Sequence, residues 1–175
     1  MKKIMFNDRY GLTKAVLEGR KTMTRRIVPD GTPLGDWEET EKMSRFEVGE
    51  VVAVAQAYKD TCWTSPVLRL KDKPGWSNKM FVYAGLMPHQ IRITNIRVER
   101  LQDISDEDCY REGIYKKTLC PPGDIDYFYH SEPRSKWEVY PSPREAFAGL
   151  IDKVSGKGTW ESNPWVFVYE FELVV

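Results

Sequence analysis

The stretch QIRITNIRVERL, Gln90–Leu101, decides the fold class of this sequence. Isoleucines alternate with polar residues as far as Ile93, and apolar residues resume on the opposite parity at Ile96. A period of two is typical of a strand with one buried face, and a change of parity indicates an extra residue in a β-bulge. We therefore predict one long strand with a bulge at Asn95.

The last segment, WVFVYEFELVV (Trp165–Val175), predicts a second long strand. Its aromatic residues and Leu173 share one parity, which we expect to face the core. Val166, Val168 and two glutamates share the other parity, which we expect to face away from it.

Shorter elements complete the predicted order. Runs of apolar or alternating residues predict strands at Lys3–Phe6, Val48–Tyr58 and Phe81–Tyr83. Residues 29–49 are rich in proline, glycine and acidic residues, and we expect a loop there. Helices are predicted to begin after three capping positions: Asn7 or Asp8, Ser105, and Ser142.

Long strands that follow one another without crossover helices argue against a parallel sheet. We therefore predict a single α+β domain over residues 1–175 that is mainly β. Its expected architecture is an antiparallel β-barrel with about three flanking helices.

Composition limits the classes of function. Lys+Arg and Asp+Glu both number 26, so the formal net charge is zero and any nucleic-acid binding needs a local basic patch. The three cysteines are widely spaced, which favours a reducing cytoplasm over a disulfide framework. No apolar run approaches the length of a membrane span or a signal peptide. We expect a cytoplasmic protein without a membrane partner.

Metal and cofactor motifs are not found in the sequence. His89 and His130 lie far apart, and there is neither an HExxH motif nor a paired-cysteine motif. No glycine-rich phosphate loop follows a predicted strand. Cys109 has no neighbouring histidine, and a small buried apolar role suits it better than a nucleophilic one. We expect neither a metal ion nor a cofactor.

The segment GRKTMTRR, Gly19–Arg26, places four cations within seven residues. It could be a solvated helix end, a phosphate clamp or an active site. Lys21 beside the hydroxyl of Thr24 is a plausible nucleophile pair, but a carboxylate is needed to orient it, and spacing alone does not name that carboxylate. From the residues alone, a phosphate-binding or solvated cluster is favoured over catalysis.

Aromatic residues are dense in DYFYHSEPRSKWEVYP, Asp126–Pro141. Tyr127 and Trp137 lie near cations, as in platforms on which unpaired bases stack. The alternative is a long loop that packs its own aromatic side chains over the domain, which is the more common arrangement.

Four blocks of the chain resemble the ASCH domain family: LEGRKTMTRR, FEVGEVVAV, ITNIRVERLQDISDEDCYREGI and NPWVFVYEFELV. The resemblance runs from about Ile4 to Val174 and is greatest to the phage and prophage-associated branch. A GxKxxTxR pattern is met by Gly19, Lys21, Thr24 and Arg26. The resemblance implies a PUA-like barrel and a cytoplasmic role linked to nucleic acid.

One bacterial branch of this family hydrolyses N(4)-acetylcytidine without a metal. The resemblance carries its catalytic Lys and Thr onto Lys21 and Thr24, and its Glu onto Glu112 when the ISDED blocks are aligned. The present chain is longer than that branch, with insertions expected near 60–80 and 115–141. Arg25 is an additional cation beside Thr24.

Three functions follow as hypotheses. The first is binding of RNA or a modified nucleoside around GRKTMTRR, with Arg20, Arg25 and Arg26 holding anionic groups and Tyr127 and Trp137 stacking on bases. The second is a metal-independent amidohydrolase acting on N(4)-acylated cytidine, with Thr24 as nucleophile, Lys21 as base or oxyanion stabiliser, and Glu112 as the orienting group or proton shuttle. The third is a non-catalytic interaction protein.

Overall fold

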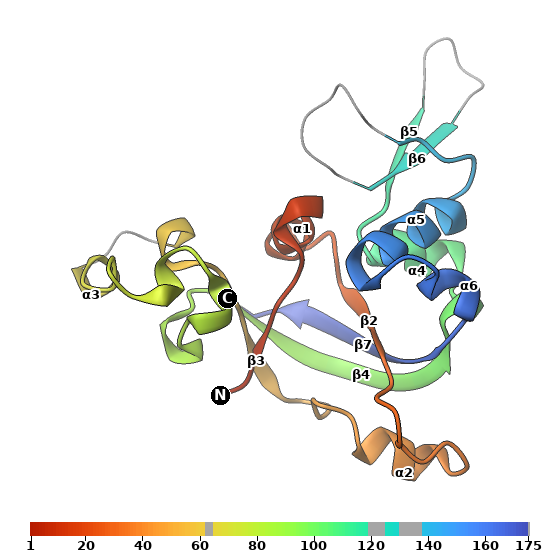
Figure 1. The fold of residues 1–175 in the computed structure, drawn as a ribbon, viewed down its shortest axis with the longest axis horizontal. Coiled ribbons are helices and arrows are strands. Elements are labelled where there is room, and N and C mark those ends of the chain that lie inside the picture. Colours follow the sequence, from red (N-terminus) through yellow and green to blue (C-terminus); the bar gives the residue numbers. More distant parts are fainter. Residues whose placement is uncertain (62–64, 119–124, 130–137, 175) are drawn as a thin grey trace.

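The computed structural model describes residues 1–61, 65–118, 125–129 and 138–174. At its centre is a five-stranded sheet in the order β1-β3-β4-β7-β2, and helices α4, α5 and α6 lie over one side of it (Figure 1). The strands of the sheet are β1 (Lys3–Ile4), β2 (Met23–Ile27), β3 (Val51–Val54), β4 (Gln90–Arg100) and β7 (Trp165–Leu173). The chain is therefore a mixed α+β domain with a sheet-rich core.

Strands β4 and β7 form the long antiparallel centre of the sheet. Their pairing runs from Ile91 opposite Leu173 to Arg100 opposite Trp165, and the register shifts between Ile93 and Asn95. The bulge predicted from the change of parity is therefore confirmed. It allows residues on both sides of Asn95 to keep apolar side chains against the core.

Both faces of β7 are covered. Phe167, Tyr169 and Phe171 are buried as expected, but Val166 and Val168 are buried as well, and Leu173 is exposed. The prediction of one outward parity was wrong for the two valines. Figure 1 shows the reason, because α4 and α5 cover the second face of the sheet.

The sheet is open among the described strands, so the predicted closed barrel is not confirmed. Strands β1 and β2 are its two edges, and β1 is only two residues long. Three of the four strand pairs are antiparallel, but β1 pairs with β3 in parallel, which the sequence did not predict. A side-chain hydrogen bond, and not backbone pairing, connects the two edges. The guanidinium of Arg26 on β2 donates to the carbonyl oxygen of Met5, which follows β1, at 2.6 Å.

Two of the three predicted caps, Ser105 and Ser142, are confirmed. The prediction of Asn7 or Asp8 as the cap of the first α-helix was wrong, because Asn7 caps the 3-10 helix Asp8–Tyr10 and Gly11 precedes the α-helix Leu12–Leu17. The Ser105 hydroxyl accepts from the Asp108 amide, and the Ser142 hydroxyl accepts from the Glu145 amide. The α-helices are α1 (Leu12–Leu17), α2 (Trp37–Lys42), α3 (Ser65–Leu68), α4 (Asp106–Arg111), α5 (Pro143–Ser155) and α6 (Thr159–Ser162). Helix α2 lies where only a loop was predicted; Asp36 caps it by accepting from two backbone amides.

Two further regions lie outside the sheet. The predicted strand at Phe81–Tyr83 was wrong: a 3-10 helix spans Lys79–Phe81, and this run pairs with none of the described strands, although Val82 is buried. Strands β5 (Tyr115–Thr118) and β6 (Ile125–Phe128) form a separate hairpin that projects beyond α4 and α5 (Figure 1). The other 3-10 helices are Asp8–Tyr10, Tyr58–Asp60, Pro74–Trp76, Ala84–Leu86 and Leu101–Asp103.

Candidate functional site

The turn between α1 and β2 carries the GRKTMTRR cations into the interior. Gly19 adopts a left-handed backbone with φ of 70°, as expected for a residue that follows a helix end. The backbone amides of Arg20 and Lys21 both donate to the carbonyl of Ala15, and the Thr22 amide donates to the carbonyl of Arg111. These bonds fix the backbone of the turn against α1 and against the end of α4.

Lys21 and Glu112 form a buried ion pair at this junction. The Lys21 Nζ lies 2.6 Å from Glu112 Oε2 and 2.8 Å from the Glu112 backbone carbonyl oxygen. The two side chains are 2% and 5% exposed. The resemblance placed Glu112 with Lys21, and the structure brings the two together although they are 91 positions apart in the sequence.

Burial shifts the pKa of Lys21. Loss of hydration lowers the pKa of Lys21 below its ordinary value, although the Glu112 carboxylate opposes this shift. Arg26 and Arg25 act in the same direction as burial, because a second positive charge disfavours the ammonium form. Lys21 is therefore a cation that can lose its proton more easily than a surface lysine.

Thr24 lies on β2, two residues before Arg26, and 95% of its surface is covered, since its exposed fraction is 5%. Within the described part of the chain its hydroxyl has no hydrogen-bond partner. A buried hydroxyl without a partner is costly unless something else satisfies it. Thr24 lines a cavity of about 160 Å³ together with Lys21 and Glu112.

We name this space the Thr24 cavity. Its polar wall is Lys21, Thr24, Arg25, Arg26 and Glu112, and its apolar wall comes mainly from α5 and the chain around Phe6. Lys21 and Thr24 line the same cavity but are not hydrogen-bonded to each other. Catalytic hydrogen bonds are often long before substrate binds, so the shared cavity is the relevant observation.

Arg25 is an internal residue. Its side chain has no exposed surface and lies 2.6 Å from Glu99, 2.9 Å from Asp108 and 3.1 Å from Glu112. Burial disfavours the charged guanidinium, but Glu112 and the other two carboxylates outweigh it and raise the pKa of Arg25. Arg25 was expected to hold an anionic ligand, and the anions it holds are carboxylates of the protein itself.

The network continues across β4, β7 and α4. Arg97 contacts Glu99, Asp108 and Glu170, and Arg111 contacts Asp108 and Glu170. Four carboxylates thus meet four cations, so the cluster is balanced when Lys21 is protonated. Its members are Glu99, Asp108, Glu112, Glu170, Lys21, Arg25, Arg97 and Arg111.

Sequence reasoning missed most of this network. One signal was available, because Arg97 and Glu99 share a parity in the predicted long strand and Glu170 lies in the second long strand. Charges repeated on one face of central strands indicate either a solvated face or a buried ionic cluster. The sequence contains nothing that distinguishes the two, since the distinction depends on α4 covering that face.

Two other predicted residues, Arg20 and Tyr127, do not line the Thr24 cavity. Arg20 donates to the Gly113 carbonyl and the Tyr115 hydroxyl, with its guanidinium 3.9 Å from the centre of the Tyr115 ring. Tyr127 lies in β6 with its ring 6.4 Å from that of Tyr110. Trp137 lies outside the described residues, so its predicted stacking role stays a prediction.

No cluster of three or more potential metal-ligating side chains occurs in the described ranges. Within the same ranges, no helix has the length and apolar character needed to cross a bilayer.

Comparison with known proteins adds one finding. No family model matches the chain, and no curated protein matches it. Among solved structures, the chain is similar to an ASCH domain from Lactobacillus crispatus JV V101, with 14% sequence identity and a TM-score of 0.41. The similarity covers 97% of this chain and 76% of that chain. At this identity and TM-score the likeness says nothing about the residues of the site.

Gly113 makes the turn that follows Glu112, and its φ of 110° disfavours any residue with a side chain. A Cβ there would also contact Leu12 at 3.4 Å. We predict that Gly113→Ala lowers the free energy of unfolding by about 1–3 kcal/mol in urea titrations. Gly35→Ala is the matched control, because that position has ordinary backbone geometry and open space. Equal effects of the two substitutions would contradict the prediction.

Proposed function

We propose that the chain is a metal-independent amidohydrolase that removes the acyl group from an N(4)-acylated cytidine. The observation that carries the proposal is the Thr24 cavity of about 160 Å³. There a buried hydroxyl, which has no partner among the described residues, lies in the same space as the Lys21–Glu112 pair. A buried hydroxyl, an amine whose pKa is lowered and a carboxylate that orients the amine are the parts of a nucleophilic site.

Each residue has one role in the proposed first step. The Thr24 oxygen attacks the acyl carbonyl carbon while its proton passes to Lys21 Nζ. The bond between that carbon and N4 then breaks, and Lys21 returns the proton to N4, which releases cytidine and leaves an acyl ester on Thr24. Water hydrolyses the ester by the same route, with Lys21 accepting the proton of the water and returning it to the threonine oxygen.

Glu112 is the positioning residue of this scheme. A neutral lysine amine has two N–H donors and one lone pair. In the structure Nζ makes two hydrogen bonds, both to Glu112, one to Oε2 and one to the backbone carbonyl. Two donors held in this way leave the lone pair for the Thr24 proton. Arg25 Nη1 donates to the other carboxylate oxygen of Glu112 at 3.1 Å, which fixes the orientation of that side chain.

The size of the cavity favours a small substrate. A volume of about 160 Å³ is below the ~300–1,000 Å³ of pockets for drug-sized ligands. Such a space suits an acylated base better than a stretch of polynucleotide. The identity of the base as cytosine comes from the resemblance described above, which pairs the same Lys, Thr and Glu with N(4)-acetylcytidine.

The test is hydrolysis of N(4)-acetylcytidine. The rate of cytidine formation is measured at a series of pH values. Because only neutral Lys21 can accept the Thr24 proton, kcat/KM should increase with pH until the lowered pKa of Lys21 is passed, which lies below 10.5. The slope should approach tenfold per pH unit well below that pKa. A rate that falls as pH rises would instead assign Lys21 to oxyanion stabilisation as a cation.

Absence of hydrolysis by folded protein, with a small panel of N(4)-acylcytidines, would contradict the proposal. The RNA-binding hypothesis would then be favoured. For that role Lys116 and Lys117 are exposed on β5 next to Tyr115, on whose ring Arg20 packs.

A further inference from the structure

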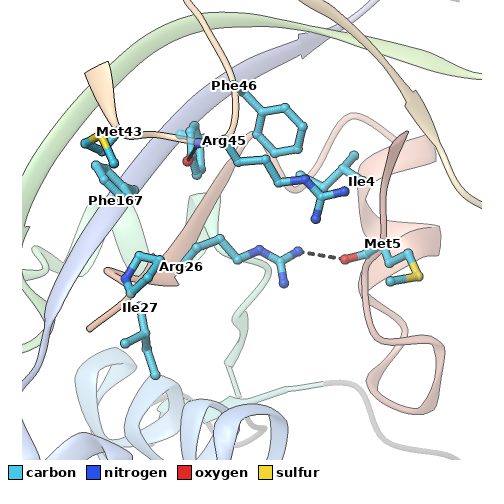
Figure 2. A pocket seen from close by; sticks show the side chains of 10 residues that line it. Ile4, Met5, Arg26, Ile27, Met43, Arg45, Phe46 and Phe167 are labelled. Carbon is cyan, nitrogen blue, oxygen red and sulfur yellow. Dashed lines mark hydrogen bonds between the residues drawn. The ribbon is translucent and has the colours of Figure 1, made fainter. Parts of the chain in front are cut away.

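A second pocket adjoins the Thr24 cavity on the other side of Arg26. It has a volume of about 270 Å³ and shares Met5, Arg26 and Ile27 with the Thr24 cavity. We name it the Arg45 pocket, after the residue at its mouth. Figure 2 shows its lining, with the Arg26 and Arg45 side chains extending the same way toward Ile4 and Met5.

Edge strand β1 and the residue after it, Met5, hold the two guanidinium groups. Arg26 Nη2 donates to the Met5 carbonyl at 2.6 Å, and Arg45 Nη2 donates to the Lys3 carbonyl at 3.2 Å. These carbonyls are two residues apart, at the unpaired edge of the sheet. Each guanidinium has five N–H donors, so most of them are left for a ligand.

The charges of this pair are not compensated by ion pairs. Among the described residues, neither Arg26 nor Arg45 forms a salt bridge, in contrast to Arg25 one position away. Burial lowers the pKa of Arg26. The Glu112 carboxylate opposes this shift, and the positive charge of Arg45 acts in the same direction as burial. Two cations held together at an apolar wall favour an anion between them.

The rest of the pocket is suited to an organic ligand. Phe46, Phe167 and Met43 form apolar walls, and Tyr169 lies at the back with its hydroxyl accepting from the Arg45 amide. A simple inorganic anion would not require this apolar surface. The lining fits an anionic group attached to an apolar or aromatic body.

We propose that Arg26 and Arg45 bind the phosphate of a nucleotide whose acylated base enters the adjoining Thr24 cavity. The inference rests on the proposed function for the identity of the base. It adds that the substrate is a nucleoside phosphate rather than the free nucleoside. We choose phosphate as the anionic group because cytidine has no carboxylate, whereas a phosphate is the anion that a nucleotide carries.

The experiment compares cytidine 5′-monophosphate with cytidine by calorimetric titration of wild-type protein and two variants. Wild type should bind the nucleotide about 10–100-fold more tightly, as expected for charge-assisted contacts to a phosphate. Arg45→Gln should lose most of that preference. Arg92→Gln is the matched control, since Arg92 is a partly exposed arginine of β4 that does not line the pocket, and it should keep the preference.

Additional measurements distinguish the phosphate pocket from the amidohydrolase proposal. Arg45→Lys should retain part of the preference, and inorganic phosphate should compete with the nucleotide but not with cytidine. Preferential nucleotide binding without hydrolysis would support the pocket and contradict the amidohydrolase. Equal binding of nucleotide and nucleoside by wild type, or an unchanged preference in Arg45→Gln, would overturn the pocket even if N(4)-acetylcytidine is hydrolysed.

Discussion

Thr24→Ala is expected to lower kcat for N(4)-acetylcytidine by at least ~10³-fold, because the variant has no atom that can form the acyl ester. The same substitution should change the free energy of unfolding by less than about 1 kcal/mol. The reason is that the Thr24 hydroxyl has no hydrogen-bond partner among the described residues, so its removal leaves no protein group unsatisfied. The combination of lost turnover and retained stability is the signature expected of a nucleophile.

Thr22→Ala is the matched control for this variant. Thr22 lies two residues earlier, directly before β2. Its hydroxyl accepts a hydrogen bond from Arg111 at 3.2 Å, and it does not line the Thr24 cavity. Its loss should reduce stability slightly and leave turnover near the wild-type value. Thr24→Ser should retain measurable turnover, since serine supplies the same oxygen. Turnover by Thr24→Ala at the wild-type rate would exclude Thr24 as the nucleophile.

Local patterns predicted those parts of the fold that depend on neighbouring residues. The bulge at Asn95 followed from a change of parity, and the helix starts at Ser105 and Ser142 followed from capping chemistry. The open sheet did not follow, because it depends on which strands meet at its edges. The parallel pairing of β1 with β3 joins segments about 50 positions apart, and a pattern of neighbouring residues cannot predict such a pairing.

The candidate site divides in the same way. GRKTMTRR marked Lys21 and Thr24 by their proximity in the chain, whereas Glu112 came only from the family resemblance. Arg25 and Arg26 are adjacent and chemically alike, yet one is enclosed by three carboxylates and the other faces two pockets. Their difference arises from alternation along β2, and the sequence does not say which face of that strand α4 covers.

Glu112→Gln is expected to lower the free energy of unfolding by about 3–5 kcal/mol, the usual result of removing one partner from a buried ion pair. The amide has nearly the size of the carboxylate, so the loss reports charge rather than packing. Lys21 and Arg25 would both keep their charges in the interior with one anion fewer. Urea unfolding at neutral pH measures the effect.

Glu172→Gln provides the surface comparison. Glu172 lies 3.8 Å from Arg92 with 64% of its side chain exposed, so its substitution should change stability by less than ~0.5 kcal/mol. Similar losses for the two glutamine variants would mean that the Lys21–Glu112 pair is solvated, which would also remove the reason for a lowered pKa at Lys21.

The effect of Glu112→Gln should depend on pH in a defined direction. Because burial lowers the pKa of Lys21, folded protein binds fewer protons than unfolded protein between that pKa and 10.5, and stability rises with pH across this window. Without the Glu112 carboxylate, which raises the pKa of Lys21, the window begins at a lower pH. The deficit of Glu112→Gln should therefore shrink as pH increases toward the lower edge of the wild-type window.

A double variant separates charge from geometry in this pair. In Lys21→Met with Glu112→Gln, the buried ammonium is absent, so the double variant should be more stable than the Glu112→Gln single variant and should lose the pH dependence described above. Recovery would be partial, because Arg25 still lacks one of its three carboxylates. A double variant that is less stable than either single variant would show that the two side chains stabilise the fold by packing. Lys21 would then lack the lowered pKa that its proposed role as a base requires.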